Sequence, residues 1–288
     1  MSRNLIARLC VAAVAIPIIL WICYQGGWWL FGMVSLFALV AIVEFLVAEG
    51  YRPGSICFSL AFLAVAAVLL TFGAGLMLDD DRMGLPVAIS VVMVPCLLLA
   101  LFMISSMLLA LGSEDPAVLF QRASRLFWGM AYVSLLYPFV LVIGIFGGTT
   151  GVFSGGDLLL FLFGLLWVGD TAAMWIGKAF GKHKLAPTVS PNKTVEGFIG
   201  GILGALAIGV LMIFWKLSSV PWYHVLIIAA GCSVFGQLGD LVESMWKRSL
   251  GIKDSSALIP GHGGILDRFD SLLFAAPFMF AYLMFFIS

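Results

Sequence analysis

The chain has 288 residues, of which 62% are apolar and 10% are charged, and its 15 basic residues balance its 15 acidic ones. Soluble domains contain roughly 25% charged residues, so this composition excludes an ordinary soluble protein. The zero net charge gives no reason to expect a nucleic-acid partner. Because a bilayer-spanning helix needs about 20 mostly apolar residues, we expect an all-α polytopic integral membrane protein with about nine transmembrane helices.

Nine apolar runs are bounded by charged residues or by clusters of glycine and proline. Their approximate limits are 5–23, 28–48, 56–78, 86–111, 126–146, 158–177, 198–215, 222–239 and 270–287. The first run follows Arg3 and Arg8, as the apolar part of a signal peptide would, but no small-residue cleavage site comes after it. We therefore interpret it as a retained span.

The positions of the basic residues predict the orientation in the membrane. With the N-terminus inside, thirteen of the fifteen Lys and Arg residues fall on inner segments, and only Arg82 and Lys216 fall on outer ones. Cytoplasmic loops carry such an excess of basic residues. We therefore expect the N-terminus in the cytoplasm and, with an odd number of spans, the C-terminus outside.

The simplest organisation is a single integral-membrane domain over residues 1–288. Its N-terminal part, residues 1–150, holds few charges and is expected to face lipid, whereas polar clusters interrupt residues 151–288. Glycines four residues apart in this second part, such as Gly177 with Gly181 and Gly197 with Gly201, predict close helix packing.

Carboxylates gather at the ends of the last apolar runs. Asp240 and Glu243 are three residues apart at the end of the eighth run, and Asp267 and Asp270 repeat this spacing where the ninth begins. On a helix each pair would share one face. Asp170 lies inside the sixth run, where a charge is costly unless it is paired or metal-bound. Oxygen ligands without clustered cysteine or histidine favour magnesium over zinc. The alternative is pairing of these carboxylates with the neighbouring basic residues, which are Lys247, Arg248 and Arg268.

Two polar segments, which the predicted topology places on the cytoplasmic face, offer groups that bind phosphate. Residues 190–194 read Ser-Pro-Asn-Lys-Thr, and residues 261–264 read Gly-His-Gly-Gly, whose glycines allow backbone N–H groups to approach an anion. Basic groups beside a carboxylate-held magnesium ion suit nucleotide phosphates. Two alternatives stay open: His262 as a structural hydrogen-bonding residue, and a set of lysines as an anchor to anionic lipid headgroups. Those lysines are Lys178, Lys182 and Lys184.

The polar segments resemble the signature of an enzyme family. Residues 244–270 have the pattern Ser-x2-Lys-Arg-x4-Lys-Asp-x5-Pro-x-His-Gly-Gly-x2-Asp-Arg-x-Asp. This pattern resembles that of phosphatidate cytidylyltransferases, also called CDP-diacylglycerol synthases. Residues 181–187 and 190–197 are similar to the same family.

The resemblance implies a reaction of CTP with phosphatidic acid that gives CDP-diacylglycerol and pyrophosphate in phospholipid biosynthesis, with Mg²⁺ as cofactor. An in-line attack of the lipid phosphate on the α-phosphorus needs no protein nucleophile, so positioning and charge neutralisation supply the catalysis. The implied metal ligands are Asp240, Asp267 and Asp270, with Glu243 and Asp254 as further candidates. The implied phosphate-neutralising residues are Lys193, Lys247, Arg248, Lys253 and Arg268. The implied binding residues are Ser190, Asn192, Gly261, His262, Gly263 and Gly264, with Asp170 and Glu196 expected to orient basic partners or a second cation.

The resemblance also implies a multi-pass protein of a bacterial-type inner (cytoplasmic) membrane, surrounded by membrane lipids, with its active site on the cytoplasmic side. A homodimer is left open. Three other functions were weighed: a cytidylyltransferase for another lipid phosphate, a lipid kinase, and a cation-coupled transporter. A transporter would place its charges near the bilayer midplane, whereas here they gather towards one face.

Overall fold

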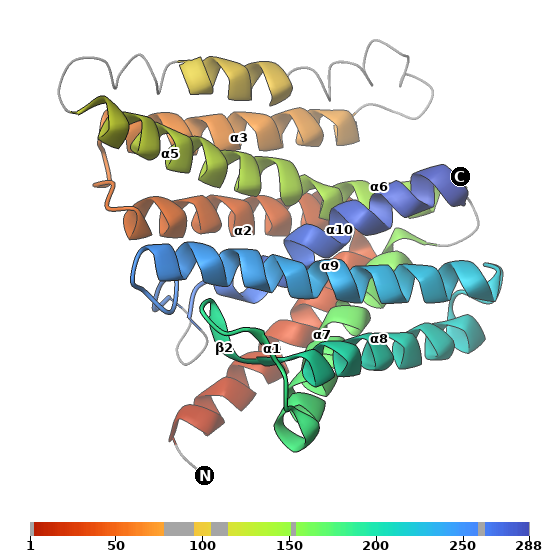
Figure 1. Ribbon diagram of the computed structural model, residues 1–288. Coiled ribbons are helices and arrows are strands. Elements are labelled where there is room, and N and C mark those ends of the chain that lie inside the picture. Colours follow the sequence, from red (N-terminus) through yellow and green to blue (C-terminus); the bar gives the residue numbers. More distant parts are fainter. Residues whose placement is uncertain (1–2, 78–94, 105–114, 151–153, 259–262, 288) are drawn as a thin grey trace. The chain divides into compact units, whose positions relative to one another are not determined.

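The computed structural model describes residues 3–77, 95–104, 115–150, 154–258 and 263–287. Figure 1 shows that this part of the chain consists of helices and one small hairpin. The elements are α1 (Arg3–Gln25), α2 (Gly27–Ala48), α3 (Ile56–Met77), a short apolar helix (Pro95–Ile104), α5 (Pro116–Leu136), α6 (Pro138–Thr150), α7 (Gly155–Phe180), β1 (Lys184–Ala186), β2 (Ser190–Thr194), α8 (Val195–Trp215), α9 (Trp222–Ser249) and α10 (Leu266–Phe286). The predicted all-α membrane class is confirmed, and the hairpin is an addition that hydropathy did not predict.

Seven helices among the described residues are long and apolar enough to cross a membrane. The apolar Ala13–Gln25 part of α1 overlaps the predicted first run, and the short helix Pro95–Ile104 falls within the predicted fourth run. Much of the fourth run, 86–111, lies outside the described residues. The count of nine spans and the orientation of the termini therefore stay predictions.

Two predicted boundaries are wrong by about three helical turns. The fifth run was expected to begin at 126, but α5 begins at Pro116, where the Asp115 side chain caps the helix by accepting a hydrogen bond of 3.0 Å from the Ala117 N–H. The eighth run was expected to end at 239, but α9 continues to Ser249. Hydropathy ends a span at its first charges, whereas these charged residues have partners within the protein that keep the helix intact.

The chain divides into two compact units, each described here by itself. The smaller unit comprises Phe31–Leu141, and the larger unit comprises Met1–Leu30 with Val142–Ser288. In the smaller unit the Phe45 ring lies where a side chain on Gly129 would stand, and Arg125 lies 3.6 Å from Glu49. In the larger unit α1 contacts α7, so the N-terminal helix belongs with the C-terminal half of the chain. The proposed single domain stays a prediction.

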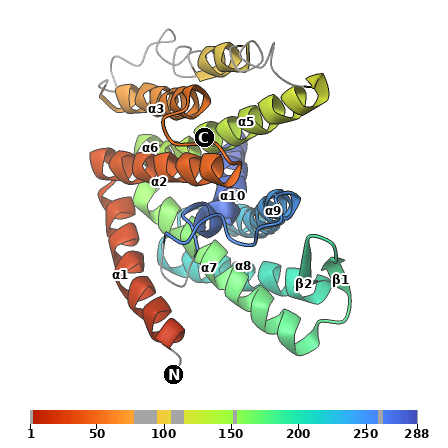
Figure 2. The ribbon, with the colours of Figure 1, turned by 90° about the vertical axis from the view of Figure 1, so that its left-hand side faces the viewer.

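Small residues let α7 and α8 pack closely in the larger unit (Figure 2). A Cβ atom on Gly197 would lie 2.9 Å from the carbonyl oxygen of Ala173, and one on Gly204 would lie 2.6 Å from the Cβ of Ala172. Neither position has room for a side chain, which confirms the packing expected from the glycine spacing. Helix α9 then packs on both α8 and α10.

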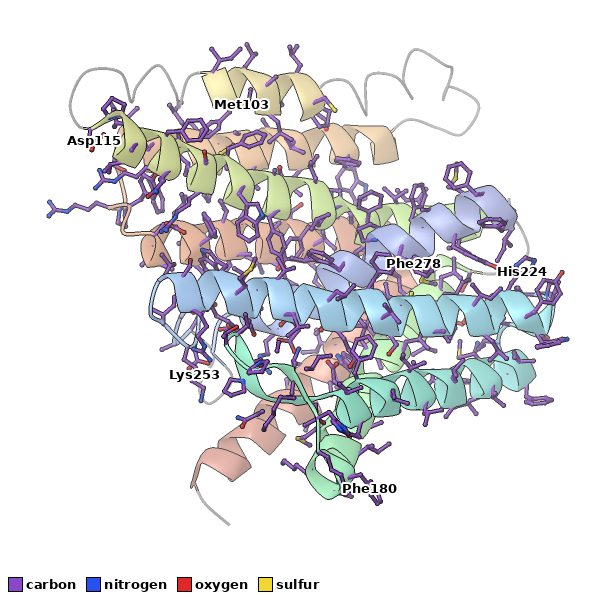
Figure 3. The ribbon with its side chains drawn as sticks, viewed as in Figure 1. Met103, Asp115, Phe180, His224, Lys253 and Phe278 are labelled. Atoms are coloured by element: carbon purple, nitrogen blue, oxygen red, sulfur yellow. The ribbon has the colours of Figure 1, made fainter. Side chains whose placement is uncertain are left out.

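The polar segments of the larger unit meet at one end, which we call the polar end. It comprises the C-terminal ends of α7 and α9, the β1–β2 hairpin, and the N-terminal ends of α8 and α10. In Figure 3, Lys253 in the turn after α9 marks the polar end, and His224 marks the opposite end of α9. The Nε of Arg248 at the end of α9 donates to the carbonyl of Val189 in the hairpin at 3.4 Å. The hairpin and the end of α9 therefore lie together in this unit.

A separate contact joins three helices at the opposite end of the larger unit. The Nζ of Lys216 lies 3.4 Å from both the Tyr24 hydroxyl and a carboxylate oxygen of Asp157. The hydrogen bond to Tyr24, followed by the Asp157 charge, raises the pKa of Lys216 above its usual value. This contact connects α1 and α7 to the end of α8.

Candidate active site

The β1–β2 hairpin carries Lys193 to the polar end. The strands pair antiparallel, with Lys184 opposite Thr194, and the Lys184 ammonium donates to the Pro191 carbonyl at 2.7 Å. The hydroxyl of Thr194 caps α8 by accepting a hydrogen bond from the Gly197 N–H at 3.1 Å. Lys184 therefore stabilises the hairpin from within, and Lys193 is positioned one residue before a helix cap.

Glu196 holds the start of the hairpin to the first turn of α8. Its carboxylate accepts the backbone N–H groups of Lys182 at 3.0 Å and of His183 at 3.3 Å, and it lies 2.7 Å from the His183 Nδ1. Glu196 was expected to orient basic partners or a second cation. Its partners in the structure are those of the hairpin, including the His183 ring that the sequence analysis did not single out.

Lys193 reaches α9 and forms an ion pair with Asp240. The Lys193 Nζ lies 2.7 Å from the Oδ2 of Asp240, and the other oxygen of Asp240 accepts a hydrogen bond from the Ser244 hydroxyl at 3.3 Å. Both members of the pair are partly exposed, with 26% of the Lys193 side chain and 35% of the Asp240 side chain accessible. The Asp240 side chain and the stem of Lys193 are thus accessible, whereas the Lys193 Nζ is shielded by the protein.

Asp267 is surrounded by donors. Its Oδ1 lies 2.6 Å from the Lys247 Nζ, and its Oδ2 accepts the N–H and hydroxyl of Ser255, both at 2.9 Å, and the Gly264 N–H at 2.8 Å. A Cβ atom on Gly263, whose φ is +81°, would lie 2.7 Å from the same Oδ2. These partners were not expected: Asp267 was interpreted as a metal ligand, and Gly264 as a phosphate donor. In the structure the two residues bond to each other and fold the segment before α10.

Glu243 and Asp270 face each other between α9 and α10. Their carboxylates interact directly, and Glu243, which is fully buried, also lies 3.3 Å from the Lys247 ammonium. Neither oxygen of Glu243 accepts a hydrogen bond from a donor in the described part of the chain. A buried carboxylate beside another carboxylate is costly without further positive charge.

Asp170 and Arg268 complete the charged network. Asp170 has an exposed side chain on α7 and interacts electrostatically with Asp270, Asp240, Lys193 and Arg268. We call Asp170, Asp240, Glu243, Asp267 and Asp270 the carboxylate cluster. Its five carboxylates face three cations, Lys193, Lys247 and Arg268, which leaves a formal excess of two negative charges.

The oxygen ligands of the carboxylate cluster are of the type that binds a hard divalent cation, although three of its carboxylates form ion pairs with lysines. No three His, Cys, Asp or Glu side chains in the described ranges already converge as a ready metal site. The pairing of carboxylates with basic residues, which was the alternative interpretation, is found for Lys247, and Lys193 pairs in the same way. The excess negative charge and the buried Glu243 oxygens nevertheless fit a cation with oxygen ligands.

Arg248 has a different environment from the lysines. Besides Val189, its guanidinium donates from Nη1 to the Ile252 carbonyl at 2.9 Å. It therefore connects the hairpin, α9 and the turn that follows α9. Its expected role in phosphate neutralisation is not tested by these contacts.

The remaining residues predicted for the site either do not contact the carboxylate cluster within the described ranges or lie outside those ranges. Lys253 and Asp254 lie exposed in the turn after α9, and Ser190 and Asn192 lie at the start and middle of β2. No contact within the described ranges brings Lys253, Asp254 or Asn192 to the carboxylate cluster. Gly261 and His262 lie outside the described residues.

Ser255 is the residue that the sequence analysis missed. It is 8% exposed and gives two of the donors on Asp267. Its position directly after Lys253-Asp254, in a short polar segment between two apolar helices, was the available signal. A serine has no distinctive pattern of its own, so only the contact identifies its role.

Comparisons with known proteins identify the family of the whole chain. A sequence model described as the cytidylyltransferase family matches residues 6–286. The chain is 34% identical over 272 residues to a protein of Staphylococcus haemolyticus named phosphatidate cytidylyltransferase, with 94% of this chain and 96% of that protein covered. Proteins of the same name from Staphylococcus epidermidis and Staphylococcus aureus are 35% and 33% identical, with the same coverage. The resemblance that rested on motifs is confirmed over nearly the whole length.

Proposed function

The chain belongs to the phosphatidate cytidylyltransferase family of nucleotidyltransferases, and we propose that it transfers the cytidylyl group of CTP to phosphatidic acid. The products are CDP-diacylglycerol and pyrophosphate. The observation that carries the proposal is the convergence of Lys193, Asp240 and Asp270, from three separate elements, at one end of a membrane-embedded unit. A reaction between a water-soluble nucleotide and a lipid needs its charged groups at such a boundary.

The proposed chemistry is a single in-line displacement at phosphorus. An oxygen of the lipid phosphate forms a bond to the α-phosphorus of CTP, the bond from that phosphorus to the bridging oxygen of the β-phosphate breaks, and pyrophosphate leaves with the electron pair. The protein supplies orientation and charge neutralisation. Lys193 and Arg268 are suited to this role because they lie beside Asp170 and Asp240. Arg268 is exposed, and the Lys193 side chain is partly exposed although its Nζ is shielded by the protein. Lys247 is more enclosed, with 12% of its side chain exposed, and acts mainly through Asp267 and Glu243.

A divalent cation, expected to be Mg²⁺, forms part of this proposal. Asp170, Asp240, Glu243 and Asp270 would hold it, because Asp267 already binds four donors. When bound, the cation would neutralise phosphate charge and polarise the reacting phosphoryl group. The excess of two negative charges in the carboxylate cluster supports one such ion.

We further propose a bacterial-type cytoplasmic membrane as the location, with the polar end facing the cytoplasm. The distribution of Lys and Arg, thirteen against two, supports this orientation, and CTP is present on that side. A homodimer is the remaining part of the proposal. Light scattering of the purified protein in detergent, corrected for bound detergent, measures the molar mass and tests it.

The decisive experiment supplies the detergent-solubilised protein with CTP labelled in the cytidine, phosphatidic acid and Mg²⁺. We expect label in a lipid-extractable product and an equal amount of pyrophosphate. The Asp240→Asn variant is the control for contaminating activity, because it keeps the shape of the side chain and removes its charge. A labelled lipid only with a different phosphate acceptor would change the substrate assignment. Absence of any labelled lipid would overturn the function and leave the transporter alternative.

A further inference from the structure

An exposed groove lies on the C-terminal part of α7, roughly one to two helical turns beyond Asp170. It has a volume of about 410 Å³ and is lined by Trp175, Lys178 and Ala179. Trp175 is 68% exposed, and the neighbouring Met174 is 48% exposed. A large indole and a lysine at one edge of a membrane helix suit the boundary between acyl chains and headgroups, where one side of a ligand is apolar and the other charged.

Three exposed lysines of the polar end have no side-chain partner among the described residues, namely Lys178, Lys182 and Lys253. Lys178 is the one that lines the groove. Lys193 and Lys247 pair with carboxylates, and Lys184 bonds to a carbonyl. Lys178 is exposed and has neither an ion pair nor a side-chain hydrogen bond within the part of the chain that the structure describes. Its ammonium is therefore available to an anion in the groove.

Lys178 forms one edge of the groove and lies roughly two turns beyond Asp170 on α7. Trp175 and Ala179 lie further around the helix. Asp170, Met174 and Lys178 follow one another at intervals of four residues, so they lie along the same side of the helix. Side chains on a helix lean towards its N-terminus, which directs the reach of Lys178 towards Asp170. Asp170 in turn interacts with Asp240, Asp270 and Lys193. The Lys178 edge is therefore the part of the groove that lies most nearly on the Asp170 side of α7, roughly 12 Å from Asp170 along the helix axis.

We propose that this groove binds the acceptor lipid of the reaction, with its phosphate against Lys178 and the first part of its acyl chains against Trp175 and Met174. The inference rests on the proposed function. A phosphate monoester carries between one and two negative charges at neutral pH, because its second ionisation lies near pH 6. The phosphodiester of an ordinary anionic lipid carries one charge. The unpaired lysine favours the former, which distinguishes the acceptor from bulk lipid.

The kinetic test compares Lys178→Met with Lys182→Met in mixed micelles of fixed ionic strength. Lys182 is an exposed lysine of the hairpin and serves as the matched loss of one charge. We expect Lys178→Met to raise the KM for phosphatidic acid about fivefold, since one lysine near a lipid surface has roughly that effect. The KM for CTP and the kcat should change by less than twofold. Trp175→Ala should raise the same KM, and Lys182→Met should leave it unchanged.

Further measurements show whether Lys178 binds phosphatidic acid specifically, binds bulk anionic lipid, or only stabilises the fold. Excess phosphatidylglycerol should not restore the KM of Lys178→Met, and the thermal midpoint of this variant should match that of the wild type. A photoreactive group attached to a cysteine at position 179 should capture phosphatidic acid, and unlabelled phosphatidic acid should compete with it while phosphatidylglycerol does not.

The outcomes distinguish this inference from the proposed function. Restoration by phosphatidylglycerol, equal effects of Lys178→Met and Lys182→Met, or a lowered thermal midpoint with an unchanged KM would each overturn the acceptor groove. Those results would leave the reaction intact if the wild type still makes the cytidine lipid. A wild type that makes no such product overturns the proposed function itself.

Discussion

The Lys193 ammonium lies 2.7 Å from the Oδ2 of Asp240, although the two residues belong to different elements and are 47 positions apart. The pair joins the hairpin to α9 and brings one cation to the edge of the carboxylate cluster. The Asp240 side chain is partly exposed, whereas the Lys193 Nζ is shielded by the protein. A substrate phosphate that binds this lysine therefore has to displace its carboxylate partner.

The first prediction concerns this lysine. Lys193→Met should lower kcat/KM for CTP about 100-fold or more, because an oriented contact to developing phosphate charge is worth roughly 3 kcal/mol. Steady-state kinetics at saturating phosphatidic acid would measure it. Lys182→Met is the control and should cost less than tenfold. Equal losses for the two variants would mean that the hairpin acts through its overall charge and not through the position of Lys193.

The second prediction distinguishes the roles of Asp267 and Asp270, which lie three residues apart at the start of α10. Asp267→Asn should lower the thermal midpoint in detergent by roughly 5 °C or more, because it removes one member of a buried ion pair with several hydrogen bonds. Asp270→Asn should not lower the midpoint without Mg²⁺, because it removes a charge that opposes Glu243. It should instead raise the Mg²⁺ concentration needed for half-maximal activity. Equal destabilisation by both substitutions would contradict the difference in their environments.

The third prediction concerns Arg248. Its guanidinium bonds to the carbonyls of Val189 and Ile252, so we expect a positioning role for which geometry matters more than charge. Arg248→Lys and Arg248→Met should both lower kcat/KM, by about tenfold, since each loses at least one hydrogen bond of roughly 1–2 kcal/mol. Hydrogen exchange at residues 184–194 should become faster in both variants. Retention of full activity by Arg248→Lys would instead indicate direct phosphate neutralisation.

The fourth prediction tests the orientation in the membrane. Lys182 lies in the exposed start of the hairpin, and Ser218 is exposed beyond the opposite end of α8. A cysteine at 218 should react with an impermeant thiol reagent added outside intact cells, and a cysteine at 182 should react only after the membrane is opened. The wild-type chain supplies the background labelling. The reverse pattern would place the polar end outside and remove CTP from its proposed side.

The sequence by itself determined the membrane class, the approximate helices and the family. These depend on local properties: apolar runs long enough to span a bilayer, glycines spaced for close packing, and a pattern of charged residues within a single stretch of chain. The same local signals predicted that the eighth span ends at 239, whereas α9 continues to Ser249. The charges that end an apolar run do not end a helix when the protein supplies partners for them. Local signals also could not predict the β1–β2 hairpin, whose strands are three and five residues long.

Only the tertiary structure decided what each charged residue contacts. Asp267 and Asp270 look equivalent in the sequence, yet one is surrounded by Lys247, Ser255 and Gly264 while the other faces Glu243. Likewise three lysines of one basic segment differ in their partners. Lys184 bonds to a carbonyl and Lys193 to a carboxylate, whereas Lys178 has no side-chain partner among the described residues. The physical reason is that electrostatic and hydrogen-bonding energies depend on distances of a few ångströms between groups far apart in the chain, and only the packing of α7 to α10 determines those distances.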